Sequence, residues 1–174
     1  LPDTLHAFAQ NPSAPAALPG WREPPPSHGP TRFVERGGGI ARIGHAGDGF
    51  CFDNEGPLHD VLLRDYAIAD RLVRNSEWQH FIADGGYRTP ALWMSDGWAT
   101  VQTQDWTAPL HWRADGMQMT LGGLLPLDPD APVRHIGWYE ADAFARGACA
   151  RRPPEAEWEA AAPGLTEATN YVCR

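Results

Sequence analysis

The chain contains no lysine. All 14 of its basic residues are arginine, against 22 aspartates and glutamates, and the net charge over 174 residues is −8. Proteins that bind nucleic acid concentrate positive charge along a stripe or on one face, so this acidic composition predicts no nucleic-acid partner. The sequence also lacks a run of about 18 apolar residues, the length that a membrane-spanning helix needs, and we therefore expect no membrane partner.

Cysteine is scarce and widely spaced. Cys51, Cys149 and Cys173 are an odd number and include no CxxC pair, which argues against a disulfide framework or a zinc knuckle. The sequence begins at Leu1, without the charged segment and apolar run of a signal peptide. We therefore expect reduced thiols, a cytoplasmic location and a chain cut from a longer protein.

The sequence also lacks the histidine spacing that is typical of a metal site on a helix. No two histidines lie three or four residues apart, the spacing that would place two imidazoles on one face of a helix. The seven are His6, His28, His45, His59, His80, His111 and His135. The acidic residues 53–55 and the pair Asp128 and Asp130 lie in predicted turns, where such side chains commonly bond to their own backbone. We expect no metal or other cofactor to be bound by this chain.

The motifs of nucleophilic catalysis and phosphate binding are also absent: the chain has no GxSxG, no HExxH and no phosphate-binding glycine loop. Cys149 has several arginines nearby in the sequence that would lower the pKa of its thiol, but no histidine is close enough in sequence to act as a base. Cys51, between two phenylalanines, is predicted to be core. We name no catalytic residue and leave the substrate-binding residues unknown.

The chain is instead rich in tryptophan, proline and glycine, with 8, 17 and 18 residues respectively. Tryptophan rings can line a pocket for a quaternary ammonium group, but in folds with little regular structure they more often fill the core, and we favour the core. Prolines spread through residues 1–32 predict a linker, with a short helix at residues 5–10. The domain is predicted to begin at Phe33.

Hydrophobic periodicity predicts both strands and helices. Residues 59–68 alternate as a strand. Asn75 is predicted to cap a helix that has Glu77 in its first turn and ends at Gly85 and Gly86. Residues 87–127 show little periodicity and are predicted to form a long ordered loop with short strands, held by buried tryptophans.

Two further helices are predicted near the end of the chain. The first spans residues 138–150, with a buried face that contains Trp138 and Phe144. The second starts at Pro154, a residue suited to a first turn, and directs Trp158 inward. Together with the strands, these helices indicate an α+β fold.

Six segments of the chain occur in the order and at the spacing of one enzyme family. They are FDNEGPLH at 52–59, LVRNSEWQHFIADGGY at 72–87, LWMSDGW at 92–98, APLHW at 108–112, PLDPDAPVRHIGWYEADAFAR at 126–146 and PPEAEWEAAA at 153–162. In these segments the chain resembles the formylglycine-generating-enzyme-like, or sulfatase-modifying-factor, domain. The chain resembles this domain in the version found in iron-dependent sulfoxide synthases of ergothioneine biosynthesis.

This resemblance implies a C-type-lectin-like α+β fold, of which residues 33–174 form the first part. Residues 1–32 would link it to an upstream helical domain that carries iron-binding histidines. Such synthases use non-heme iron(II) and oxygen to join cysteine or γ-glutamylcysteine to trimethylhistidine as a sulfoxide. The resemblance implies that iron is bound outside this chain, which shapes the substrate cleft and is inactive alone.

The chain departs from the family pattern at four positions. Where relatives read ARWAGxRLPTEAEWE, this chain reads ARGACARRPPEAEWE, so Gly147 replaces a tryptophan, Arg152 a leucine and Pro154 a capping threonine. Arg74 stands where the VTN motif has threonine. Loss of a buried tryptophan costs about 3–5 kcal/mol and loss of a cap about 1 kcal/mol, which indicates a divergent or decaying copy.

Three alternative functions stay open. One is a formylglycine-generating oxidase, which acts on a cysteine of a sulfatase peptide, and another is a selenoneine synthase, which has a similar pattern. The third is a non-catalytic lectin-like binding module that uses its tryptophan surface.

Overall fold

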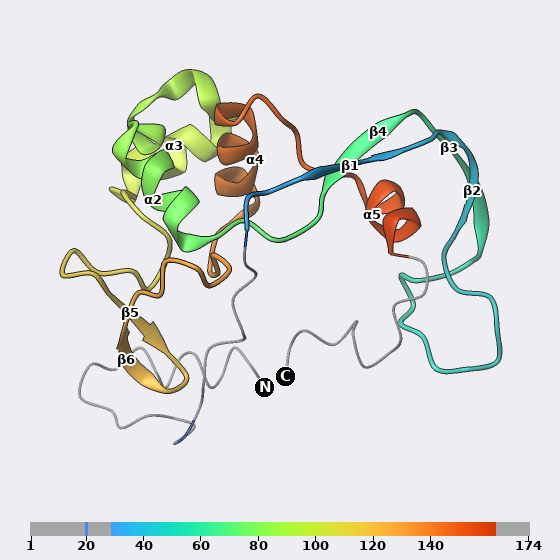
Figure 1. The fold of residues 1–174 in the computed structure, drawn as a ribbon, viewed down its shortest axis with the longest axis horizontal. Helices are drawn as coiled ribbons and strands as arrows, with labels where there is room; N and C mark the ends of the chain where they lie inside the picture. Colours follow the sequence, from blue (N-terminus) through green and yellow to red (C-terminus); the bar gives the residue numbers. More distant parts are fainter. Residues whose placement is uncertain (1–19, 21–28, 163–174) are drawn as a thin grey trace. The chain divides into compact units, whose positions relative to one another are not determined.

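The computed structural model describes residue 20 and residues 29–162, which belong to two compact units. We call residues 71–152 the helical unit; residues 20, 29 and 30 group with it. We call residues 31–70 and 153–162 the ribbon unit. Figure 1 shows the elements of both units along the chain. The short helix predicted at residues 5–10, and most of the predicted linker, lie outside the described residues.

The ribbon unit is built on a long antiparallel hairpin. Its strands are β1 (Phe33–Arg36), β2 (Gly39–Ile43), β3 (His59–Leu63) and β4 (Tyr66–Ala69). β1 pairs with β4 and β2 with β3. Phe33 lies opposite Ala69 and Ile43 opposite His59, so one register runs through both pairs. The strand predicted at residues 59–68 is thus confirmed in its span, although the structure divides it into β3 and β4.

The hairpin is interrupted between β1 and β2 on one side and between β3 and β4 on the other. Glycine makes this break possible. The amide of Gly38 donates to Oδ1 of Asp65 at 2.7 Å across the break. A Cβ at Gly38 would lie 2.6 Å from the carbonyl oxygen of Leu63, closer than any side chain tolerates. Only glycine allows the two chains to approach this closely.

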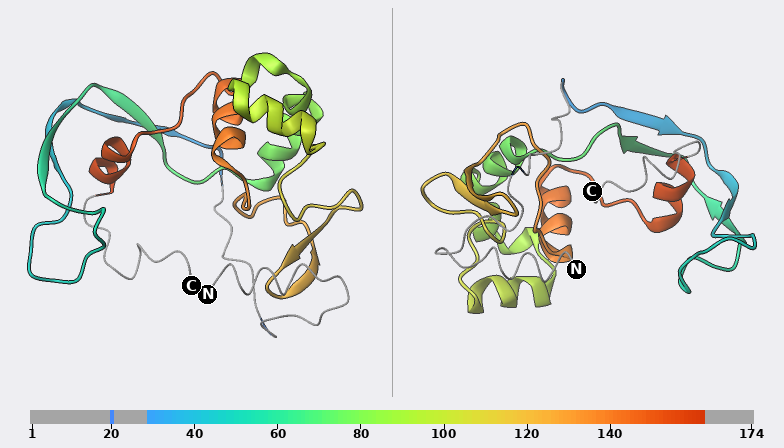
Figure 2. Two further views of the ribbon diagram at one scale, coloured as in Figure 1. Left: turned by 180° about the vertical axis from the view of Figure 1, so that it is seen from behind. Right: turned by 90° about the horizontal axis from the view of Figure 1, so that it is seen from below.

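Helix α5 (Glu155–Ala161) packs against β2, β3 and β4, as both views in Figure 2 show. The hydroxyl of Tyr66 donates to the carbonyl of Glu157 at 2.8 Å, and the amide of Gly44 donates to Oε1 of Glu159 at 2.8 Å. The prediction that Trp158 points inward is wrong: its side chain is 55% exposed, and Glu157 is buried instead.

The helical unit contains three α-helices and a small hairpin. These are α2 (Asn75–Ala83), α3 (Ser95–Thr103), α4 (Trp138–Gly147), β5 (Met117–Thr120) and β6 (Gly123–Pro126), with short 3₁₀ turns at Gly86–Arg88 and Pro90–Leu92. Their core is formed by Trp78, Phe81, Tyr87, Trp93, Val101 and Ala143. The indole of Trp78 stacks on the ring of Phe144, with centroids 4.8 Å apart. The core role predicted for tryptophan is confirmed for Trp78 and Trp93.

Three expectations for this unit need correction. The short strands predicted within residues 87–127 are present as β5 and β6, but the prediction missed helix α3. α4 buries Glu140 and Ala143 rather than Trp138, which is 50% exposed. Asn75 does not cap α2: its buried side-chain amide donates to the carbonyl of Asp128, while the carboxylate of Glu77 accepts from the amide of Arg74, the true N-cap.

Helices and paired strands occur in the same chain, which confirms the α+β class. In the part of the chain that the structure describes, no helix has the length and apolar character needed to cross a membrane.

Candidate functional site

A buried hydrogen-bond network joins α2, α4 and the 3₁₀ turn at Gly86–Arg88. Nε1 of Trp78 donates to the hydroxyl of Tyr87 at 3.3 Å, and that hydroxyl donates to Oε1 of Glu140 through a short contact. Oε2 of Glu140 accepts from the amide of Gly137 at 2.6 Å. All three side chains are nearly inaccessible, with Glu140 only 3% exposed.

The burial of this network perturbs its titrations. Desolvation raises the pKa of Glu140 above its usual range, against the lowering effect of the hydrogen bonds from Gly137 and Tyr87. Burial, and then the charge of Glu140, raise the pKa of Tyr87. A carboxyl with a raised pKa in a cleft is a candidate for acid–base catalysis. Here, however, both carboxyl oxygens bond to protein groups and the side chain is buried, so the network holds α4 against α2.

A second group of titratable side chains is formed by His111 and His135. Their ring centroids lie 4.8 Å apart at 79°, and both residues have a left-handed backbone, with φ of 75° and 59°. The amide of Leu110 donates to the carbonyl of His135, which joins the two loops, and the amide of Met119 in β5 donates to the carbonyl of His111. Sequence spacing gave no sign of this pair, because its members lie in separate loops.

Two imidazoles do not complete a metal site, which needs at least three protein ligands. Within residue 20 and residues 29–162, no group of three or more histidines, cysteines, aspartates or glutamates is arranged to hold an ion. His6 and His28 lie outside these residues. The described residues therefore do not fit a mononuclear iron site.

The acidic turns that the sequence singled out have structural partners. Oδ1 of Asp128 accepts from the amide of Asp130 at 2.9 Å, as expected for aspartate in a turn. Asp130 also pairs with the guanidinium of Arg74 at 3.2 Å. In the other turn, the carboxylate of Glu55 accepts from the amide of Phe52 at 3.1 Å. Both turns use their carboxylates to order the backbone.

The two described cysteines are free thiols. Cys149 is exposed and follows α4 in a left-handed conformation, with φ of 53°. The prediction that Cys51 belongs to the core is wrong, because it is only half-buried and its neighbours Phe50 and Phe52 are 83% and 60% exposed. Cys173 lies outside the described residues.

Two of the four departures from the family pattern make specific contacts. The largely buried side chain of Arg74 pairs with Asp130 and donates to the carbonyl of Gly29 at 2.6 Å. The guanidinium of Arg152 lies 4.0 Å from the ring centroid of Trp138, a cation–π contact. These arginines are integrated in the helical unit, which argues against simple decay at the two positions.

The other two departures, Gly147 and Pro154, lack such side-chain contacts. Gly147 is exposed, and a side chain built there would meet the ring of Phe81 at 3.4 Å and then Leu92. Pro154 is the N-cap of α5 and makes no side-chain hydrogen bond to the helix. A tryptophan at the first position and a threonine at the second would supply the contacts that this chain lacks.

The profile of one protein family, the sulfatase-modifying factor enzyme 1-like domain, matches residues 24–174. The chain belongs to this family.

Among curated relatives, the chain is 41% identical to the hercynine oxygenase of Mycolicibacterium thermoresistibile and 43% identical to that of Mycobacterium tuberculosis. These alignments cover 67% and 63% of this chain but 26% of each relative. It is also 34% identical to the formylglycine-generating enzyme of Streptomyces coelicolor, over 78% of this chain and 48% of the relative. The chain thus spans about a quarter of the hercynine oxygenases it matches.

Proposed function

We propose that this chain is part of an oxygenase of the hercynine oxygenase type, in which it supports the substrate cleft while other residues bind iron. The observation that carries the proposal is the 41–43% identity to hercynine oxygenases of three mycobacterial species. The identity to formylglycine-generating enzymes is lower, at 34% or less. The C-type-lectin-like topology and a cytoplasmic location are parts of the same proposal.

The proposed reaction is the oxidative joining of trimethylhistidine to cysteine or γ-glutamylcysteine, and a selenium donor is an alternative to the thiol. The described residues do not fit the ligand set of a mononuclear iron site. What they supply is a rigid scaffold: the Trp78–Tyr87–Glu140 network and the aromatic core hold α2 and α4 together. A cleft wall formed by such a scaffold would orient substrates without touching the metal.

A segment exchange tests the proposal. Residues 31–162 replace the aligned segment of the Mycolicibacterium thermoresistibile hercynine oxygenase, and sulfoxide formation is measured with iron(II), oxygen, trimethylhistidine and each thiol. We expect product from the chimera and none from the 174-residue chain alone. The relative with its own segment re-inserted is the control. A folded, iron-loaded chimera without product, or efficient turnover by the chain alone, would contradict the proposal.

A formylglycine-generating oxidase is the second candidate. The observation in its favour is coverage, because the alignment with the Streptomyces coelicolor enzyme extends over 78% of this chain, more than any of the three hercynine oxygenases reaches. The test is a second chimera, in which residues 31–162 replace the aligned segment of the Streptomyces coelicolor enzyme. Conversion of a cysteine to formylglycine in a sulfatase-derived peptide by this chimera, measured by mass spectrometry, would select this function.

A non-catalytic binding module is the third. Relatives without activity exist, since the chain is 29% identical to the inactive C-alpha-formylglycine-generating enzyme 2 of Bos taurus over 64% of its length. Trp138 of the helical unit and Trp158 of the ribbon unit are both exposed, and either ring by itself would provide a contact for a glycan or a betaine. Calorimetry with these ligands distinguishes the module from an enzyme segment.

A further inference from the structure

The ribbon unit leaves one face of its hairpin uncovered. Ile40 and Leu62 lie directly opposite each other in the β2–β3 pair and are 74% and 77% exposed. Side chains alternate along a strand, so these two project away from the face that holds Ile43, which is buried at 4%. We call the face that carries Ile40 and Leu62 the outer face. Opposed side chains on one face of a strand pair contact each other and form a joint apolar surface, and exposed apolar surface of this kind is a candidate for binding another polypeptide.

The loop between β2 and β3 carries a second apolar group. Phe50 and Phe52 are 83% and 60% exposed, and their rings meet edge to face with centroids 5.2 Å apart. The loop is not free to bury them: the amide of His45 donates to the carbonyl of Glu55 at 2.7 Å, and the Glu55 carboxylate holds the amide of Phe52. Exposed aromatic rings on a braced loop are suited to act as anchors in an interface.

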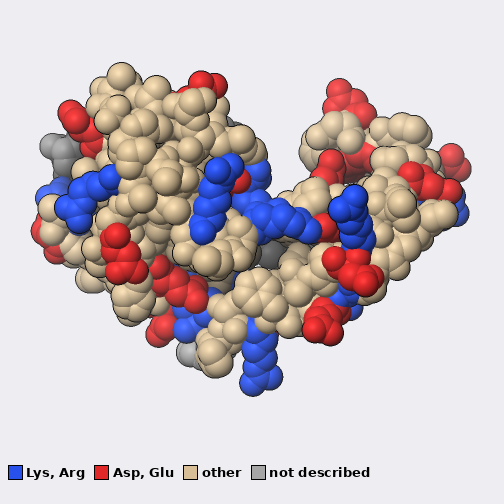
Figure 3. Space-filling view, turned by 90° about the horizontal axis from the view of Figure 1, so that it is seen from above, with Lys and Arg blue, Asp and Glu red and all other residues tan. Residues whose placement is uncertain are grey.

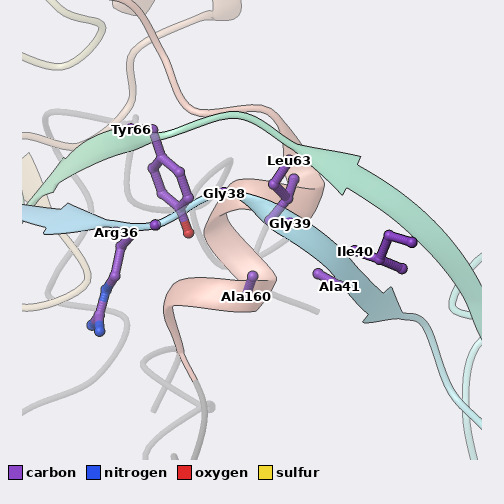
Figure 4. A pocket seen from close by; sticks show the side chains of 9 residues that line it. Arg36, Gly38, Gly39, Ile40, Ala41, Leu63, Tyr66 and Ala160 are labelled. Carbon is purple, nitrogen blue, oxygen red and sulfur yellow. The ribbon is translucent and has the colours of Figure 1, made fainter.

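The backbone of the ribbon is also incompletely paired. Among the described residues, each of its two sheets has only two strands, so their outer edges meet no further strand. Two-stranded hairpins are marginal by themselves, and an open edge accepts an added strand through main-chain hydrogen bonds. The side of the hairpin opposite the outer face is occupied by α5. There, Figure 4 shows Tyr66 extending from β4 toward α5. Tyr66 and the glycines of the Gly37–Gly39 break are among the residues that line a cavity of about 170 Å³.

The net charge of the ribbon unit indicates which kind of polypeptide would bind its outer face. The described residues of the ribbon unit contain four arginines and ten aspartates and glutamates, a net −6 of the chain's −8. On the face drawn in Figure 3, red carboxylates outnumber blue arginines over this unit. A second copy of the chain would bring like charges together, whereas a segment with arginine or lysine beside its apolar residues would be attracted.

We propose that the outer face and the adjoining open edge of the ribbon bind an extended polypeptide segment in which apolar side chains alternate with arginine or lysine. This inference rests on the proposed function, because we expect the segment to come from the part of a hercynine oxygenase-type protein that this chain does not span. Main-chain pairing along the edge provides affinity, Ile40 and Leu62 bury apolar side chains, and the net negative charge of the ribbon unit attracts the basic residues.

A peptide array provides the test. Overlapping 12-residue peptides cover the Mycolicibacterium thermoresistibile hercynine oxygenase outside its 116 residues aligned with this chain, and the fluorescently labelled 174-residue chain is the probe. We expect binding to peptides that combine β-branched or aromatic residues with arginine or lysine. The affinity should fall several-fold between 50 and 500 mM salt, because exposed charges are screened.

Two matched variants locate the binding surface. Leu62→Glu on the outer face should weaken binding at least tenfold, whereas Leu110→Glu, at a 63% exposed site on the helical unit, should leave it unchanged. Circular dichroism establishes that both variants are folded. Absence of any binding peptide, binding that ignores Leu62→Glu, or concentration-dependent dimers that this substitution dissolves would each overturn the proposal. The peptide experiment measures no catalysis, so its failure would not contradict the proposed function. If instead the segment-exchange chimera failed to form product, the peptide experiment would still decide whether the outer face binds a polypeptide.

Discussion

The hydroxyl of Tyr87 links α2 to α4 through two buried hydrogen bonds. It accepts from the indole of Trp78 and donates to the carboxyl of Glu140, and all three groups lie in the aromatic core. A buried polar group that loses its partner keeps its desolvation cost without the compensating bond. The stability of the helical unit therefore depends on this hydroxyl more than on any surface ion pair.

Replacing Tyr87 with phenylalanine should lower the free energy of unfolding by about 1–3 kcal/mol, because the Trp78 indole and the Glu140 carboxyl would both lose a buried partner. Urea unfolding followed by tryptophan fluorescence measures the change. Tyr139→Phe, in the same unit but outside this network, is the matched control and should change stability by less than 0.5 kcal/mol. Equal effects of the two substitutions would show that the network contributes nothing specific.

The raised pKa of Glu140 predicts a pH dependence with a definite sign. The folded state binds the Glu140 proton more tightly than the unfolded state, whose carboxyl titrates near its ordinary value of 4.5. The contribution of Glu140 to stability is therefore largest below that value and decreases as pH rises through the raised folded pKa.

The Glu140→Gln variant, which resembles the protonated acid at every pH, isolates this effect. Its stability relative to the wild type should rise across the same pH window, as measured by urea unfolding at a series of pH values. A difference between the two proteins that stays constant with pH would mean that Glu140 is not perturbed.

At the scale of elements, α3 shows how a tertiary contact can override local propensity. Gly97 lies inside the helix, where alanine would ordinarily be better by about 1 kcal/mol. A Cβ at this position would lie 2.7 Å from Cβ of Tyr139, the second residue of α4. The glycine therefore permits the close approach of α3 and α4.

The Gly97→Ala variant should accordingly be destabilised by about 1–3 kcal/mol, the cost typical of overpacking, in spite of its better helix propensity. Thermal unfolding followed by circular dichroism provides the measurement. Gln102→Ala, at an exposed position of the same helix, should be neutral or slightly stabilising. A stabilised Gly97→Ala protein would show that the two helices can separate at little cost.

Individual helices and strands also show which predictions from local sequence patterns were correct and which were wrong. The β3–β4 region follows from alternation, and the structure confirms it. The prediction that glycine ends α2 is close: the helix ends at Ala83, and Gly85 follows its C-cap in a left-handed conformation. The orientations of Trp138 and Trp158 were predicted wrongly, because a large apolar side chain was assumed to face inward. In each helix a glutamate is buried instead, Glu140 in α4 and Glu157 in α5. The burial of Glu140 is compensated by hydrogen bonds from the hydroxyl of Tyr87 and the amide of Gly137.

At the scale of the whole molecule, the buried core is divided unequally between the two units. All six members of the aromatic and aliphatic cluster belong to the helical unit, whereas Ile43 is the large buried apolar residue of the ribbon unit among the described residues. Apolar burial is the main source of folding free energy. The ribbon unit should therefore open more easily than the helical unit.

Hydrogen exchange tests this ordering. Amides in α2 and α4 should be protected by the largest opening free energies, and those of β2 and β3 should exchange at least tenfold faster, because local opening of the ribbon exposes little apolar surface. Mass spectrometry of peptides from the 174-residue chain resolves the two regions. Equal protection in both would show that they unfold as one cooperative unit.

The sequence by itself determined the α+β class, the strand region at residues 59–68 and helix α2, and the family to which the chain belongs. These features depend on residue order, alternation and the special backbone of glycine, all of which are local. Only the tertiary structure decided that Tyr87 meets Glu140, that His111 meets His135 and that Ile40 and Leu62 remain exposed. These outcomes depend on contacts between segments far apart in the chain, and a side chain's burial is fixed by what packs against it rather than by its neighbours in sequence.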